Sequence, residues 1–139
     1  MEAMKAIKRW SVFLSAIIIL GCNAQQASSD HASAVKNMDS EEATNLLAKN
    51  SDIIIIDVRT PAEFDAGHIK GAKNINISDS EFQSQIEKLD RDSTYFVYCR
   101  TGNRSGRAVK LMEQLKFKSI YHLQHGITEW IGEGKPVEK

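Results

Sequence analysis

The sequence predicts an α/β fold, a small parallel β-sheet flanked by helices on both faces. From Met38 onward, short apolar runs that suit strands alternate with segments whose apolar residues repeat at helical spacing. Strands that alternate with helices are joined by crossover connections, and such connections produce a parallel sheet. The chain has 139 residues, which is enough for one domain of this kind and too few for two.

Four segments are predicted to be the strands of this sheet. The continuous run of isoleucines at 53–56 is typical of a central parallel strand that is covered on both faces. Residues 94–98 and 119–123 are further short apolar runs, and residues 74–77 alternate between polar and apolar side chains. Ligands of such sheets bind beyond the carboxyl ends of the strands, so the residues that follow these segments are the candidates for function.

Two helices are predicted from their first residues. Asp39 and Glu42 have the spacing of a capping box, in which the N-cap and the third helical residue satisfy each other's backbone amides. Thr60 and Glu63 repeat this spacing, with a proline at the first helical position. Gly67 is expected to end this second, short helix.

Apolar residues spaced three and four apart predict three later helices, of which the first is expected at 79–89. These residues are Phe82, Ile86 and Leu89 in the first helix, Ala108, Leu111, Met112 and Leu115 in the second, and Ile127, Trp130 and Ile131 in the third. We expect each set to face the core, because one apolar stripe is enough to pack a helix on a sheet.

Residues 1–21 have the features of a signal peptide. A positively charged start precedes an apolar stretch at 10–20, which is too short to span a bilayer as a helix. The stretch ends in residues 19–22, which resemble the lipobox of bacterial lipoproteins. That resemblance implies cleavage before Cys22 and acylation of its thiol and its new amino group. An ordinary signal peptide with a chance cysteine is the alternative.

The segment 22–37 is predicted to be the lipidated cysteine and a flexible tether, because it is rich in Gln, Ala and Ser and lacks apolar periodicity. The folded domain is then expected at 38–139. These expectations place the protein in the cell envelope of a bacterium, exported and anchored to a membrane on the periplasmic or outer-membrane side.

The charge pattern excludes a nucleic-acid partner. The chain has 18 basic and 18 acidic side chains, with neither a basic stripe nor an acidic tract. The histidines at 31, 68, 122 and 125 lack the spacing of metal ligands, so no metal site and no cofactor are expected. A monomer is the default expectation.

Cys99 is the main candidate for chemistry. With Cys22 acylated, Cys99 has no partner for an internal disulfide, and a free thiol in an exported protein is a liability unless its reactivity is used. It directly follows a predicted strand and directly precedes a predicted helix. Because backbone amides and the helix dipole favour an anion at a helix N-terminus, we expect a lowered pKa and a nucleophilic sulfur.

The loop that follows Cys99 suits an anionic ligand. Its glycine lets the backbone amides turn inward, and its two arginines add positive charge. Five residues are therefore predicted to bind the substrate: Arg100, Thr101, Gly102, Asn103 and Arg104.

Asp57 and Arg59 are predicted to support this loop. They follow the 53–56 strand, so they lie at the same sheet edge as Cys99, where we expect them to hold neighbouring loops through ion pairs and hydrogen bonds. Direct participation in catalysis is the alternative. Arg104 is an alternative partner for Asp57, and His68 is expected to be a structural hydrogen bonder.

Three ordered motifs resemble those of rhodanese-like sulfurtransferase domains, in their single-domain form, from about residue 40 to about residue 135. The N-terminal motif consists of Asp57, Val58 and Arg59, then Glu63 and Phe64, then residues 67–72, then Asn74 and Ile75. Residues 98–105 resemble the active-site loop, with four residues between Cys99 and Arg104. Leu123, Gly126 and Trp130 resemble the C-terminal motif, with His125 where many relatives have glycine.

The resemblance implies transfer of sulfane sulfur through a persulfide on Cys99. The donor would be a small anion such as thiosulfate, and the acceptor would be cyanide or a thiol. Rhodanese-like domains also serve as non-catalytic or regulatory binding modules and as persulfide carriers for other proteins, which are the alternatives. A cysteine-dependent phosphatase is a weaker alternative, because Arg104 comes one residue too early for a phosphate cradle.

Overall fold

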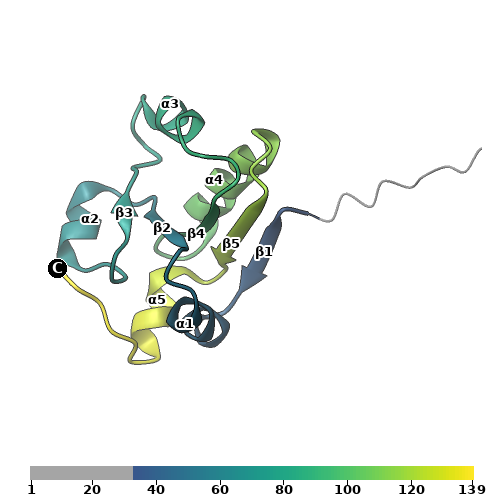
Figure 1. The fold of residues 1–139 in the computed structure, drawn as a ribbon. Helices are drawn as coiled ribbons and strands as arrows, with labels where there is room; N and C mark the ends of the chain where they lie inside the picture. The colour runs from purple at the N-terminus through teal and green to yellow at the C-terminus, as the bar shows by residue number, and fades with distance from the viewer. Residues whose placement is uncertain (1–32) are drawn as a thin grey trace, which may run out of the picture. The chain divides into compact units, whose positions relative to one another are not determined.

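Five parallel strands form a single sheet in the order β1-β5-β4-β2-β3. The structure is a computed structural model that describes residues 33–139, and Figure 1 shows their arrangement. The strands are β1 (Val35–Met38), β2 (Ile54–Asp57), β3 (Lys73–Asn74), β4 (Thr94–Tyr98) and β5 (Ser119–Leu123). The predicted signal peptide, Cys22 and most of the predicted tether lie outside the described residues.

The predicted end of the tether is wrong. Residues 35–38 form β1, an edge strand in which Val35 lies opposite Ile120 and Met38 lies opposite Leu123. The two middle residues of this strand are polar and exposed, so the sequence shows no apolar run there. The folded domain therefore begins before the predicted boundary at residue 38.

The helices between the strands follow their predicted caps. They are α1 (Ser40–Lys49), α2 (Pro61–Ala66), α3 (Phe82–Glu87), α4 (Asn103–Gln114) and α5 (Gly126–Gly132). Both predicted capping boxes are formed, by Asp39 with Glu42 and by Thr60 with Glu63. The helix predicted at 79–89 and the strand predicted at 74–77 are shorter than expected, because turns occupy the residues between β3 and α3.

Helices cover both faces of the sheet, which confirms the predicted fold class. Helices α3 and α4 lie on one face, and α1 and α5 lie on the other (Figure 1). Their buried side chains belong to two separate cores. In the central strand β4, Tyr95 and Val97 belong to the first core, while Phe96 and Tyr98 belong to the second. Burying a side chain such as Phe96 contributes about 1.5–3 kcal/mol to stability.

One predicted core residue of α5 is exposed. Ile127 and Trp130 are buried, and the Trp130 indole N–H donates a hydrogen bond to the Pro136 carbonyl over 2.9 Å. Ile131 is 52% exposed, which contradicts its predicted place in the core. It follows Trp130 directly, so the two side chains point in different directions from this short helix.

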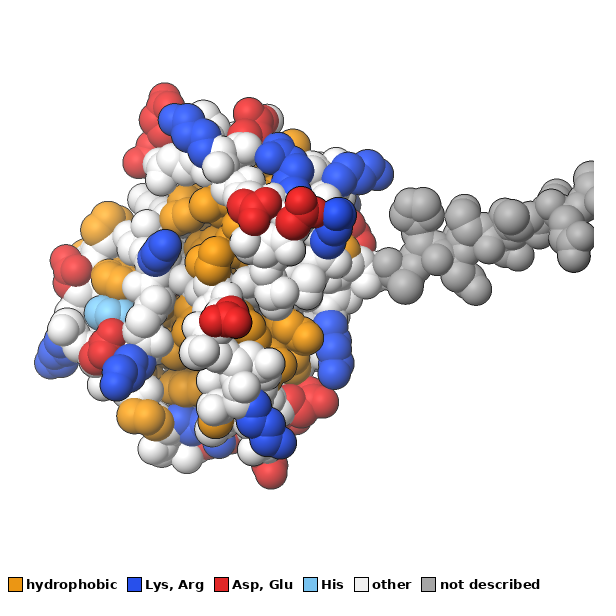
Figure 2. Space-filling view, in the orientation of Figure 1, with side chains coloured by type: hydrophobic (Ala, Val, Ile, Leu, Met, Phe, Trp, Pro, Cys, Tyr) orange, Lys and Arg blue, Asp and Glu red, His pale blue; other side chains and the backbone are white. Residues whose placement is uncertain are grey.

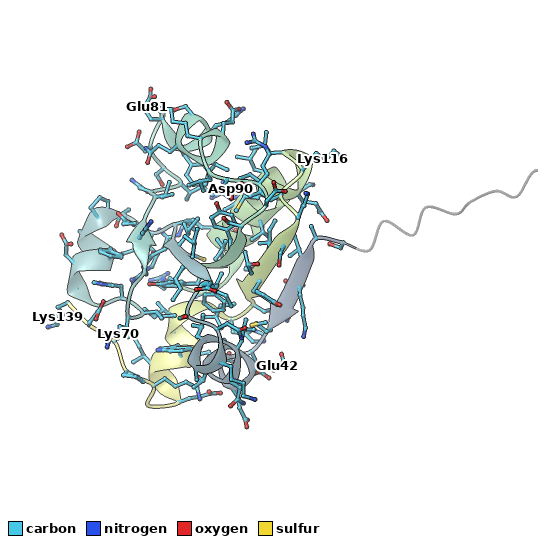
Figure 3. The ribbon with its side chains drawn as sticks, viewed as in Figure 1. Glu42, Lys70, Glu81, Asp90, Lys116 and Lys139 are labelled. Carbon is cyan, nitrogen blue, oxygen red and sulfur yellow. The ribbon has the colours of Figure 1, made fainter. Side chains whose placement is uncertain are left out.

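Charged side chains surround the sheet. Acidic and basic groups lie next to one another on the face shown in Figure 2, with apolar side chains visible between them. The labelled side chains of Glu81, Lys116 and Lys139 project from the periphery of the domain (Figure 3). Among the helices of residues 33–139, none has the length and apolar character needed to cross a membrane.

Candidate active site

Cys99 lies at the carboxyl edge of the sheet, immediately after β4. The next strand, β2, ends beside it, since the backbone N–H of Val58 donates to the Tyr98 carbonyl over 3.0 Å. Gly102 is the N-cap of α4 and has a left-handed backbone with φ of 95°. The loop therefore turns from the strand into the helix within four residues, as the sequence predicts.

The sulfur of Cys99 accepts two hydrogen bonds. The backbone N–H of Gly102 and the hydroxyl of Ser105 each lie 3.2 Å from Sγ. Burial raises the pKa of the Cys99 thiol, but hydrogen bonds from Ser105 and from the amides of Thr101 and Gly102 outweigh it. The resulting pKa is lower than that of an ordinary thiol, although the residue is only 1% exposed.

Two glycines let the Cys99 loop pack directly on the start of α5. A Cβ atom at Gly102 would lie 1.9 Å from a carbonyl oxygen of the turn after β5. A Cβ atom at Gly126, whose φ is 67°, would lie 2.3 Å from the Arg100 carbonyl oxygen. The backbone N–H of Ile127 donates to the Cys99 carbonyl over 2.9 Å, so α5 holds the loop by main-chain contacts.

His125 occupies an undemanding backbone position. Its φ of −103° and ψ of 4° are open to any residue, in contrast to the left-handed conformation of Gly126 beside it. The side chain is exposed. The backbone therefore gives no reason for a glycine at this position.

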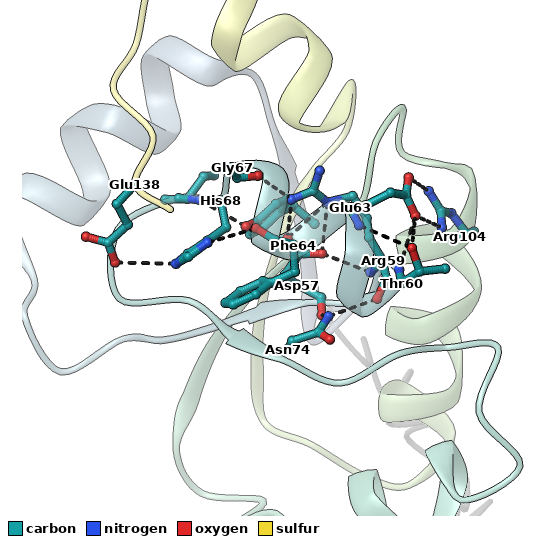
Figure 4. Close-up of polar contacts among 12 residues, drawn as sticks. Asp57, Arg59, Thr60, Glu63, Phe64, Gly67, His68, Asn74, Arg104 and Glu138 are labelled. Carbon is teal, nitrogen blue, oxygen red and sulfur yellow. Dashed lines mark hydrogen bonds and ion pairs between the residues drawn. The ribbon is translucent and has the colours of Figure 1, made fainter.

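Arg104 binds Glu63, which contradicts the alternative that it pairs with Asp57. Its two terminal nitrogens donate to the two carboxylate oxygens of Glu63 over 2.8 and 2.7 Å. Chiefly through these hydrogen bonds, Arg104 lowers the pKa of Glu63 to about 2, against an opposing effect of burial. This ion pair joins α4 to α2 beside the Cys99 loop (Figure 4).

Asp57 and Arg59 form a buried ion pair of their own. Arg59 Nη2 donates to Asp57 Oδ2 and to the Gly67 carbonyl, both over 2.7 Å (Figure 4). The amide of Asn74 donates to the carbonyls of Asp57 and Arg59, and the guanidinium carbon of Arg59 lies 5.8 Å from the centre of the Tyr98 ring. These contacts connect β2, β3 and the turn after α2. The supporting role of Asp57 and Arg59 stays a prediction.

His68 is a structural residue, in agreement with its predicted role. Its Nδ1 lies 3.0 Å from the Phe64 carbonyl oxygen, and its ring stacks on Phe64 with centroids 3.7 Å apart. The backbones of His68 and Glu138 exchange two hydrogen bonds of 2.9 Å. These contacts attach the last residues of the chain to the turn that follows α2 (Figure 4).

The structure adds three polar residues that the sequence did not single out. Ser105, which contacts the Cys99 sulfur, has its hydroxyl oxygen 2.8 Å from His122 Nε2. His122 Nδ1 lies 2.8 Å from Asn37 Oδ1. In the sequence, His122 is only one of four histidines that lack the spacing of metal ligands. Within the described range, no three His, Cys, Asp or Glu side chains are placed to hold a metal ion.

The predicted substrate-binding residues all belong to the Cys99 loop or its flanks. Arg100, Thr101 and Asn103 are exposed, whereas Gly102 is buried against the turn after β5. Arg104 is half-buried and engaged by Glu63. The binding of a substrate by these five residues stays a prediction.

Three features define the class of this α/β domain. They are the sheet order, the cysteine loop between β4 and α4, and the glycine contact from α5. A model of the rhodanese-like domain matches residues 39–133. The chain therefore belongs to the rhodanese-like domain family.

Relatives of this chain include proteins with sulfurtransferase names. A sulfurtransferase of Allochromatium vinosum is 30% identical over 103 residues, which cover 74% of this chain and 94% of the relative. A probable adenylyltransferase/sulfurtransferase MoeZ of Mycobacterium tuberculosis is 35% identical over 109 residues, which are 77% of this chain but only 28% of the relative. A rhodanese-related protein from Thermoplasma volcanium has a crystal structure that matches with a TM-score of 0.64 and 36% identity, over 74% of this chain and 97% of that protein.

Proposed function

We propose that this protein is a sulfurtransferase that moves sulfane sulfur from a small anionic donor such as thiosulfate to a thiol or cyanide, through a persulfide on Cys99. The observation that carries the proposal is the environment of the sulfur. Sγ accepts hydrogen bonds from the Gly102 amide and the Ser105 hydroxyl, and the pKa of the thiol is lowered. A thiolate and a persulfide are both anions, so the same donors stabilise the resting forms of the cycle.

The reaction has two steps at Cys99. In the first, the thiolate attacks the outer sulfur of thiosulfate, a new S–S bond forms, and the old S–S bond breaks with its electron pair leaving on sulfite. In the second, a thiolate or cyanide attacks the terminal sulfur of the persulfide, and the Cys99 thiolate leaves. No net oxidation of the protein occurs, and Cys99 returns to its starting form.

The contacts of Arg104 argue against the phosphatase alternative. A phosphate cradle needs a guanidinium that faces the bound oxygens. Here both terminal nitrogens of Arg104 are held by the carboxylate of Glu63. The short loop and this engaged arginine favour a small sulfur anion over a phosphoryl group.

The relatives that support the proposal differ in how much of their length this chain matches. The Allochromatium sulfurtransferase is matched over nearly its whole length, whereas this chain spans about a quarter of the Mycobacterium protein. A single domain is therefore compatible with a sulfurtransferase role, and sulfur donors or acceptors that are proteins remain within the proposal. A rhodanese-like module that binds a partner without chemistry is the competing function.

Intact mass spectrometry of the protein after exposure to thiosulfate tests the proposal. The protein used in this experiment carries the substitution Cys22→Ala, so that Cys99 is its only thiol. We expect a gain of one sulfur atom, which an acceptor thiol removes, and no gain in Cys99→Ser. A protein that gains no sulfur from thiosulfate or other sulfane donors, or that hydrolyses an aryl phosphate through Cys99, contradicts the proposal.

Export as a lipoprotein is a further part of the proposal. Its support is the charged and apolar pattern of residues 1–21 and the lipobox-like residues before Cys22. Two or more acyl chains on one cysteine exceed what stable membrane anchoring requires. Cell fractionation of the full chain and of Cys22→Ala tests this: we expect only the first in the membrane fraction, and equal partition of both contradicts lipidation.

A further inference from the structure

A row of polar side chains leads from Cys99 through the interior to the surface of β1. Ser105 Oγ lies 3.2 Å from the sulfur, His122 Nε2 lies 2.8 Å from Oγ, and Asn37 Oδ1 lies 2.8 Å from His122 Nδ1. Ser105 is fully buried and His122 is 6% exposed, whereas Asn37 is exposed. The reactive sulfur is thus connected to solvent by hydrogen bonds through otherwise apolar packing.

The sheet register places these groups in line. His122 of β5 lies opposite Val97 of β4 on one side and opposite Asn37 of β1 on the other. Cys99 comes two residues after Val97, and residues two apart on a strand point to the same face. Ser105 reaches this face from the first turn of α4 and closes the gap between the strands.

The hydrogen-bond partners determine the protonation of His122. Asn37 Oδ1 can only accept, so the proton of the neutral ring is on Nδ1. Nε2 then carries a lone pair that faces the Ser105 hydroxyl, whose single proton can be donated either to this nitrogen or to the Cys99 sulfur. Burial lowers the pKa of His122, which keeps the ring neutral and this lone pair available near neutral pH.

We propose that Ser105 and His122 form a proton relay for Cys99, with His122 as a positioning residue that acts through Ser105. As the S–H bond breaks, its proton binds Ser105 Oγ, and the hydroxyl proton of Ser105 passes to His122 Nε2. The products are a thiolate, a serine hydroxyl that donates to it, and an imidazolium. The reverse transfer restores the thiol. The inference rests on the proposed function, which needs the thiolate.

The relay ends in a surface hollow that the Cys99 loop does not line. His122 and Asn37 line this hollow together with Lys110 and Glu113 of α4. Lys110 and Glu113 are the ionisable residues that line this hollow besides His122, and their charges are opposite. A proton can therefore leave His122 on a different side from the exposed loop residues, where a sulfur donor would arrive.

The first test measures the pH dependence of Cys99 alkylation by iodoacetamide, in the full chain with Cys22→Ala. Asn37→Asp places a carboxylate on Nδ1, so the imidazolium and the thiolate are both favoured, and we expect alkylation at pH 6 to rise about three- to ten-fold. Asn45→Asp, the same change on the exposed surface of α1, is the matched control and should have no effect. Equal profiles for these two variants would overturn the relay.

A second variant changes the rate in the opposite direction. His122→Phe keeps a buried ring but has no nitrogen, so alkylation at pH 6 should fall about ten-fold and should follow a single ionisation. His125→Gln, a change at an exposed histidine three residues away, should keep the original profile. If His122→Phe does not fold, the Asn37→Asp measurement still decides, because Asn37 is at the surface.

Imidazole NMR provides a readout that does not depend on catalysis. We expect the ring of His122 to carry its proton on Nδ1, and its titration to shift when Cys99 is blocked by methylthiolation. A proton on Nε2, or a titration that is indifferent to the block, contradicts the relay. If the protein takes up sulfur in the mass experiment but the His122 titration ignores the block of Cys99, only the relay is overturned. If the titration responds to the block but no sulfur is taken up, only the proposed function is overturned.

Discussion

Two buried polar clusters lie at the carboxyl edge of the sheet, one on each face. The Asp57 cluster (Asp57, Arg59 and Tyr98) lies on the face covered by α1 and α5, and it contains a full ion pair. The Cys99 cluster (Cys99, Ser105, His122 and Asn37) lies on the face covered by α4, and it contains the proposed proton relay. The adjacent residues Tyr98 and Cys99 thus belong to clusters with different tasks, one that holds loops and one that serves the proposed chemistry.

The ion pair of the Asp57 cluster holds the opposite charges of Asp57 and Arg59 in place inside the domain. The carboxylate of Asp57 is fully buried, and Arg59 donates to both of its oxygens from the side chain. Burial and the charge of Asp57 raise the pKa of Tyr98, which keeps the phenol neutral while its oxygen accepts from the Ile69 amide. The raised pKa values of Arg59 and Tyr98 keep the guanidinium charged and the phenol neutral near neutral pH, so the cluster is suited to hold loops.

The largest effect should come from the nucleophile itself. Cys99→Ser keeps the size of the side chain and an acceptor for the Gly102 amide, so we expect sulfur transfer to fall to background. The free energy of unfolding should change by less than about 1 kcal/mol. Steady-state sulfur transfer and urea denaturation measure the two quantities. Turnover that persists in this variant would show that Cys99 is not the nucleophile.

The next largest effect should come from breaking the ion pair of the Asp57 cluster. Arg59→Met leaves Asp57 buried without its partner, and we expect a loss of about 3–5 kcal/mol in the free energy of unfolding. Arg107→Met, at an exposed position of α4, is the matched control and should change stability by less than about 0.5 kcal/mol. If the variants are equally stable in urea, the Asp57 cluster does not hold the fold.

A smaller effect is expected where α5 meets the Cys99 loop. Gly126→Ala forces either the Arg100 carbonyl or α5 to move, at a cost of about 1–3 kcal/mol, and the shift should slow sulfur transfer. Gly132→Ala, near the end of the same helix, meets no atom within 4 Å and is the control. Thermal unfolding and the rate of sulfur transfer should be measured on both variants, and we expect both quantities to fall in Gly126→Ala but not in Gly132→Ala. Normal activity in Gly126→Ala would mean that the loop does not need this contact.

The smallest effect concerns the ion pair between α2 and α4. Glu63 has a pKa of about 2 in the fold, below its ordinary value of 4.5, so its stabilisation is present above pH 4.5 and is lost as the pH falls toward 2. The pair is partly exposed, so we expect about 1 kcal/mol. Glu63→Gln should remove this part of the acid dependence in denaturation at pH 7 and pH 3.

Glu42→Gln is the matched control for this last prediction. Glu42 occupies the third position of the other capping box, and no arginine is bound to it among residues 33–139. Glutamine can keep the capping box in both variants. The free energies of unfolding of the two variants at pH 7 should therefore differ by the contribution of the ion pair with Arg104. An identical acid dependence in both would assign the effect to the helix caps.

Much of the sheet could be predicted because every strand except β1 has a local signal. The bounds of β4 and β5 match the predicted runs, and Cys99 lies at the predicted edge. β1 was missed, because an edge strand with two exposed polar residues has no apolar pattern. The choice between Asp57 and Glu63 as the partner of Arg104 also lay beyond the sequence, since it depends on where α2 packs against α4.

The connection from Cys99 through Ser105 to His122 could not be predicted for a related reason. It requires the register between β4 and β5, the rotation of α4 that presents Ser105, and a strand that the sequence hides. No local pattern encodes these three conditions. His122 comes two residues after the apolar Ile120 in β5, and this spacing of two is the only local signal that it points to the same interior face.

The burial of Cys99 also affects how the protein would survive outside the cytoplasm. Oxidants attack exposed thiolates and convert them to sulfinic and sulfonic acids, which are not readily reduced. At 1% exposure, Cys99 offers almost no surface to such molecules. A second sulfur bound to it extends the side chain by one atom. The cargo would then be the first atom to meet an oxidant, ahead of the sulfur of Cys99 itself.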